Sequence, residues 1–158
     1  MALLTSLYLC SRTVYAAVGT PTGSGARVVA AAQTELPEGC LINGVITNEA
    51  DLTAALKEFF TANKLPMNRV ALIAGGSQFM HRILSLPAMS EKKRMAVLSH
   101  ELASGGAEVK APLDDYMLLS RDARTRVDTV LATRVEQSVI AGYDALAKAV
   151  GFKLYSID

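Results

Sequence analysis

The chain has 158 residues, of which 51% are hydrophobic and 20% charged, so it can bury a sizeable core and its composition argues against disorder. Its formal net charge of +1 provides no overall field that would recruit nucleic acid or anionic lipid, and we expect no nucleic-acid partner. No apolar stretch approaches the roughly 20 residues of a membrane span, so we expect no direct insertion into a membrane.

The first third of the sequence predicts three strands. Short apolar runs at 3–9, 13–19 and 27–33 are separated by a polar turn and by a glycine-rich turn over 19–25. This order favours a meander of three strands. The apolar start also lacks the leading basic residue of a secretory signal peptide, which favours a cytoplasmic protein.

A helix is predicted next. Asn48 lies three residues before Asp51, a spacing typical of a helix start, and the helix should end near Asn63. Its apolar stripe comprises Leu52, Leu56, Phe59 and Phe60. A buried strand over 69–74 should follow it.

The second half predicts a similar alternation of strands and helices. Strands are expected over 78–84, 115–121 and 126–133, and a helix should begin after Ser90 and end at Gly105. A last helix should end at Gly151 before a strand over 152–157. Its apolar stripe comprises Val135, Val139, Tyr143, Leu146 and Val150.

These elements predict an α/β (α+β) fold with two subdomains, 1–75 and 76–158. Gly75 and Gly76 interrupt two apolar runs without a charged linker, which makes them the best boundary.

Three segments carry a resemblance to a known family: NGVITNEADLTAALKEF from Asn43, ILSLPAMSEKK from Ile83, and RVDTVLATRVEQSVIAGYDALAKAVGFKLYSID from Arg126. In order and spacing they resemble the actin-like ATPases of pilus assembly and cell division, the PilM-type and FtsA-type proteins, with the PilM type the more similar. The resemblance implies a partial actin-like (ribonuclease H-like) subdomain with a mixed sheet in 1–75. It also implies a small 1C-like (SHS2-like) α+β subdomain in 76–158.

The first phosphate turn of that family departs from its pattern here. The family needs an acidic residue and a glycine, because a carboxylate manages metal and water and a glycine lets backbone amides approach phosphate. Tyr8 stands where the acidic residue would be, and Cys10 and Ser11 stand in the turn. The sequence also stops at Asp158, where the family would continue into a second phosphate loop. We therefore expect no catalytic activity, no cofactor and no metal.

The resemblance implies a cytoplasmic scaffold or adaptor of a type IV pilus or related secretion assembly. Its expected partner is the cytoplasmic N-terminal peptide of a single-pass inner-membrane protein, which would hold it at the membrane periphery. A groove between the subdomains near Gly75, Gly76 and Ser77 is the expected peptide site, and exposed sheet edges would favour self-association. The alternative is a fragment of a longer actin-like ATPase, of pilus assembly or cell division, that binds ATP and magnesium only when complete.

Other candidate chemistry is weaker. His81 and His100 lack further ligands at metal-binding spacing, and adjacent Asp114 and Asp115 would face opposite ways in a strand. Cys10 as a nucleophile has no assignable base, and it and Cys40 are expected to be reduced. The run 91–94 is most simply the solvated start of a helix, with a basic patch for an acidic partner as the alternative.

Overall fold

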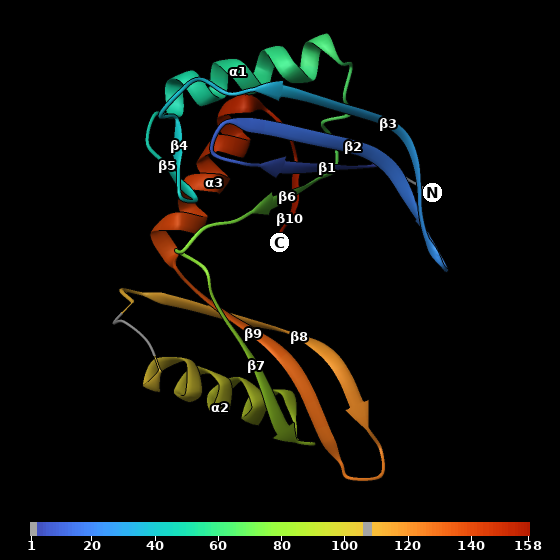
Figure 1. Cartoon of the computed structure of the whole chain (residues 1–158), viewed down its shortest axis with the longest axis vertical. Coiled ribbons are helices and arrows are strands. Elements are labelled where there is room, and N and C mark those ends of the chain that lie inside the picture. The colour runs from blue at the N-terminus through green and yellow to red at the C-terminus, as the bar shows by residue number, and fades with distance from the viewer. Residues whose placement is uncertain (1–2, 106–108) are drawn as a thin grey trace. The chain divides into compact units, whose positions relative to one another are not determined.

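A computed structural model describes residues 3–105 and 109–158, which form two compact units. Unit 1 runs to Ser77 and resumes at Val139, and unit 2 comprises Gln78–Ser138. Both are α/β, which confirms the fold class expected from the sequence. Figure 1 labels the elements of each unit.

Unit 1 contains a mixed sheet of five strands in the order β10-β6-β1-β2-β3. β1, β2 and β3 form an antiparallel meander, as predicted, whereas β6 lies parallel to both β1 and β10. The strands are β1 (Leu4–Leu9), β2 (Thr13–Thr22), β3 (Gly25–Glu35), β6 (Val70–Ala74) and β10 (Leu154–Ile157), and the helices are α1 (Glu49–Ala62) and α3 (Gln137–Val150).

One face of this sheet forms the core of unit 1. Alternate side chains of the strands are buried there, as in Leu7 of β1, Val14 of β2 and Leu72 of β6. The apolar stripes of α1 and α3 complete the core, and Phe60 of α1 stacks on Phe152 with ring centroids 5.6 Å apart. The predicted cap of α1 is confirmed, because the Asp51 amide donates to the Asn48 side chain at 3.1 Å.

Unit 1 also contains a small hairpin that the sequence reading omitted. β4 (Leu41–Ile42) and β5 (Val45–Ile46) pair in antiparallel fashion around Asn43 and Gly44, whose φ angles are 50° and 80°. An Asn-Gly pair between short apolar runs is the usual signal for such a turn. The Tyr143 hydroxyl of α3 donates to the Gly44 carbonyl at 2.8 Å, and burial raises the pKa of Tyr143 to about 12, so this hydroxyl keeps its proton.

Unit 2 is a sheet of three antiparallel strands with one helix on it. The order is β7-β9-β8, and the elements are β7 (Met80–Pro87), α2 (Glu91–Ser104), β8 (Pro112–Asp122) and β9 (Val127–Glu136). α2 packs its apolar stripe on one face of the sheet. The core there comprises Leu86, Leu98, Leu102, Val130 and Ala132.

Ion pairs extend this small core between α2 and the sheet. Asp128 of β9 is fully buried and accepts hydrogen bonds from Arg94 of α2 at 2.5 Å and from Arg121 of β8 at 2.8 Å. Arg134 of β9 bonds Asp114 of β8 at 2.7 Å and the Ser99 carbonyl of α2 at 3.0 Å. The helix is therefore fixed to the sheet by charged groups as well as by apolar contacts.

The division of the chain differs from the two consecutive subdomains expected from the sequence. The chain first passes from unit 1 to unit 2 between Ser77 and Gln78, two residues after the predicted boundary. However, α3 and β10 return to unit 1 instead of continuing unit 2. The reason is that β10 finds a free edge on β6, and the Val70 amide also bonds the Lys153 carbonyl at 3.0 Å. Helical periodicity shows an apolar face without showing which sheet covers it.

Several predicted bounds also differ. Val135 lies in β9 and not in the last helix, which begins at Gln137. The expected turn over 19–25 is tighter, because β2 continues to Thr22 and β3 begins at Gly25.

None of the helices in the described part of the chain is long and apolar enough to cross a membrane.

Candidate functional site

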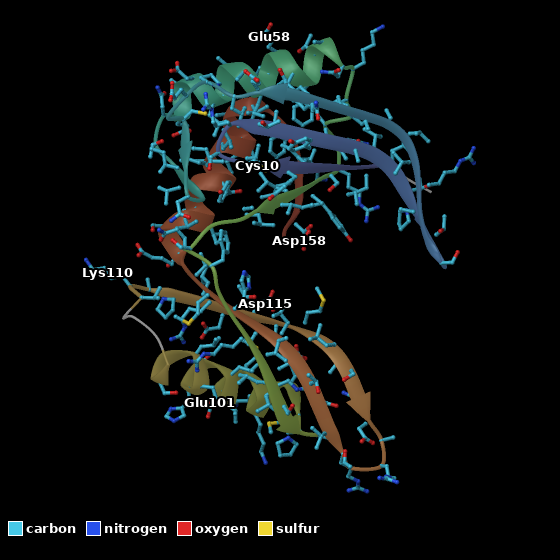
Figure 2. The ribbon with its side chains drawn as sticks, viewed as in Figure 1. Cys10, Glu58, Glu101, Lys110, Asp115 and Asp158 are labelled. Carbon is cyan, nitrogen blue, oxygen red and sulfur yellow. The ribbon has the colours of Figure 1, made fainter. Side chains whose placement is uncertain are left out.

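The residues predicted to form a degenerate phosphate turn lie between β1 and β2 of unit 1, where Figure 2 labels Cys10. The turn is closed by the Cys10 amide, which donates to the Thr13 carbonyl at 2.9 Å, and Ser11 is exposed. Tyr8 precedes it on β1, and a hydrogen bond with Cys10 raises the pKa of the Tyr8 phenol above 10.0. The Tyr8 side chain therefore offers a neutral hydroxyl, not a carboxylate, where a metal-binding acid would be needed.

Gly75, Gly76 and Ser77 lie at the end of unit 1, against the β4–β5 turn. The Ser77 amide donates to Asn43 Oδ1 at 3.0 Å, and the Asn43 side-chain amide also bonds the Ser77 hydroxyl. A Cβ on Gly76 would lie 2.3 Å from the Asn43 carbonyl oxygen, and the φ of Gly76 is 151°. This close approach of two backbone segments explains the glycine at position 76. The expected groove between the subdomains stays a prediction.

Unit 1 leaves apolar side chains exposed on the second face of its sheet. Tyr8 and Tyr15 are 41% and 43% exposed and stack with ring centroids 6.2 Å apart. Beside them is an open depression of about 530 Å³ with a floor of small side chains. It is lined by Ser6, Tyr8, Tyr15, Ala16, Ala17, Ala31, Ala32 and Gln33.

Unit 2 has a comparable open face, opposite α2. Strand register places Ile83 of β7, Leu131 of β9 and Met117 of β8 in one row across the three strands. Ile83 and Met117 are 67% and 62% exposed, whereas Leu131 between them is half-buried. Large apolar side chains this exposed and this contiguous are typical of interaction surfaces.

The two outer strands of unit 2 add hydrogen-bonding capacity to this row. Because β9 is central, β7 and β8 are both edge strands, and each has backbone groups on one side that no strand of this sheet pairs with. An extended peptide could add to either edge while its alternate side chains contact the open face. We define the binding face as Ile83, Leu131 and Met117 together with these two edges.

The sequence reading missed the binding face. Apolar residues of β7 point to both faces of the sheet, with Ile83 on the open face and Leu86 in the core, so alternation alone could not separate the two faces.

The other residues considered from sequence are not brought together into a catalytic group. His81 Nδ1 lies 2.9 Å from Thr133 Oγ1, Asp114 is paired with Arg134, and both cysteines are free thiols. In the described ranges, no three His, Cys, Asp or Glu side chains cluster as metal ligands.

Comparison with known proteins identifies the fold. The sequence matches no described protein-family model and no curated protein. The structure resembles a chain of the solved "PilM-PilN type IV pilus biogenesis complex", with a TM-score of 0.82 and 18% sequence identity over 99% of this chain. It thus has that fold, as the resemblance in the sequence implied, and it spans 46% of the matched chain.

A second solved structure is much less similar. It is an exopolyphosphatase from Cytophaga hutchinsonii, with a TM-score of 0.29 and 13% identity over 46% of this chain and 25% of that one.

Proposed function

We propose that the chain is a non-catalytic scaffold of a type IV pilus or related secretion assembly, and that it binds the cytoplasmic N-terminal peptide of a single-pass inner-membrane protein. The observation that supports this most is the backbone likeness over 99% of the chain to a component of the PilM–PilN complex. The protein would act at the cytoplasmic side of the inner membrane, where its partner holds it.

The binding face of unit 2 supports the peptide as partner. A protein–peptide contact draws its affinity from a few large apolar side chains at its centre and from backbone hydrogen bonds at a sheet edge. Ile83 and Met117 provide the first, and the edges of β7 and β8 provide the second. Self-association through a free edge such as β3 stays a prediction.

Substitutions on the binding face should weaken peptide binding. We expect Ile83→Asp combined with Met117→Asp to weaken the affinity about tenfold or more, because two apolar contacts are replaced by hydrated charges. The measurement is calorimetric titration with a synthetic peptide of the cytoplasmic N-terminus of a PilN-type protein from the same genome. The matched control is Val28→Asp with Val29→Asp in unit 1, because these side chains are 58% and 57% exposed and lie outside the binding face. Equal loss in both double variants would contradict the assignment of the binding face.

The chain should not bind nucleotide. With Mg-ATP in the same calorimeter we expect no saturable heat, because Tyr8 supplies no carboxylate and Cys10 replaces a glycine in the phosphate turn. Saturable binding of ATP by this chain would contradict the non-catalytic proposal.

The second candidate function is that of a longer actin-like ATPase of which this chain is one part. It is favoured by one observation, that the chain spans 46% of the structure it matches. ATP and magnesium would then bind only with the remaining subdomains present, and a parent reading frame that continues into a glycine-rich phosphate loop would support it.

A further inference from the structure

One end of unit 2 concentrates positive charge that the net charge of +1 conceals. Segments 91–94 and 121–128 carry six cationic side chains and three acidic ones. The first segment begins α2, and the second contains the turn between β8 and β9. The Ala88 amide, just before α2, donates to the Arg126 carbonyl in that turn at 2.8 Å, so the two segments share one end of the unit, as Figure 1 shows.

Four of these cations are free to act on a partner. Arg94 and Arg121 are engaged with the buried Asp128, whereas Lys92, Lys93, Arg124 and Arg126 are exposed and belong to no ion pair within the described part of the chain. Asp122 is held in the turn, where its side chain accepts hydrogen bonds from the amides of Arg124 and Thr125. We call Lys92, Lys93, Arg124 and Arg126 the cationic end.

The shape of this end limits what it can bind. Residues 123–126 are all exposed and lie beyond the last β8–β9 pair, Asp122 with Val127, so they form a turn that protrudes from the end of the sheet (Figure 1). An extended acidic peptide gains affinity from a groove or a sheet edge, and the turn is neither. Single-stranded nucleic acid is bound through stacking aromatic groups, and 91–94 and 121–128 contain none. A planar anionic surface needs only protruding cations.

We propose that the cationic end binds the surface of a bilayer that contains anionic phospholipids, without inserting into it. Arginine and lysine bind headgroup phosphates through charge-assisted hydrogen bonds, and each raises the affinity for an anionic leaflet by about fivefold. This inference uses different residues from the binding face and does not depend on the peptide or the pilus assembly.

Vesicle sedimentation tests the proposal. The chain should bind vesicles of phosphatidylcholine with about one third phosphatidylglycerol at low salt, should not bind phosphatidylcholine alone, and should dissociate as salt screens the charges. The variant Lys92→Gln, Lys93→Gln, Arg124→Gln and Arg126→Asn removes four cations and should bind the anionic vesicles several hundredfold more weakly, at roughly fivefold for each. Asparagine is chosen at position 126 because the φ of Arg126 is 55° and asparagine tolerates that region.

A matched control removes four cations elsewhere. Lys57→Gln, Lys64→Asn, Lys110→Gln and Lys153→Gln changes the net charge equally, and Lys64 likewise has a φ of 50°. We expect this control to retain vesicle binding, and both variants to keep the wild-type unfolding midpoint. If both variants lost vesicle binding equally, net charge alone would explain the binding, and the proposal would be overturned. Binding of a poly-glutamate peptide or of a DNA duplex without vesicle binding would also overturn it.

Discussion

Asp128→Ala should lower the thermal stability of unit 2 selectively. The Asp128 side chain is fully buried and compensates two arginines, one of which, Arg94, has a side chain only 8% exposed. Removing one partner leaves a buried charge without compensation, which is among the most destabilising changes in a small domain. We expect the unfolding midpoint of unit 2 to fall by roughly 10 °C or more. The measurement is thermal unfolding by circular dichroism, with hydrogen exchange of β7, β8 and β9 to locate the effect.

Asp144→Ala is the matched control for this prediction. Asp144 also forms an ion pair, with Lys148 one helical turn away, but their side chains are 48% and 76% exposed. An exposed pair contributes little because water screens it, so this variant should unfold as the wild type does. If the two aspartate variants were equally stable, the ion pairs of unit 2 would have no special role.

The same carboxylates should make unit 2 sensitive to acid. Hydrogen bonds from Arg121 lower the pKa of Asp128 below 3.8, and hydrogen bonds from Arg134 do the same for Asp114, although burial acts in the opposite direction in both. Because the folded pKa is the lower one, the stability is fully present above 3.8 and is lost as pH falls below it through the folded values. Asp128→Ala should show a shallower loss over this range, since the contribution of Asp128 is then absent.

Gly76→Ala should destabilise unit 1, where the chain leaves it. The new Cβ would lie 2.3 Å from the Asn43 carbonyl oxygen, and backbone atoms would have to move to relieve this clash. The φ of 151° also disfavours any residue with a side chain. We expect a loss of about 1–3 kcal/mol in the free energy of unfolding, measured by urea denaturation. Faster amide exchange in the β4–β5 hairpin should accompany it, because Asn43 also holds Ser77.

The neighbouring glycine provides the control. A Cβ on Gly75 would have no atom within 4 Å, so Gly75→Ala should have little effect on stability. The same loss in both variants would show that the close backbone approach at Asn43 is not what requires a glycine at position 76.

The sequence predicted local structure better than it predicted the connections between elements. Asn48 and Asp51 define the start of α1 by themselves, because a cap depends only on residues within one turn. The alternation of Val14, Ala16 and Val18 likewise identifies β2 as a half-buried strand. The return of α3 and β10 to unit 1 depends on the free edge of β6, which no local pattern records.

The candidate site was predictable only in part. Tyr8 and Cys10 could be placed from the sequence because they flank Leu9, the last residue of the first strand. The row of Ile83, Leu131 and Met117 could not, because it forms when residues far apart in sequence align across three strands. Which face stays open was also undetermined, since that depends on where α2 packs.

We propose that this chain binds a peptide through unit 2, and hydrogen exchange with the peptide bound tests that claim most directly. With a saturating amount of the PilN-type N-terminal peptide, we predict slower exchange of amides on one edge strand, β7 or β8, and no protection in the turn between β1 and β2. Unchanged exchange throughout unit 2 at saturation would contradict the claim.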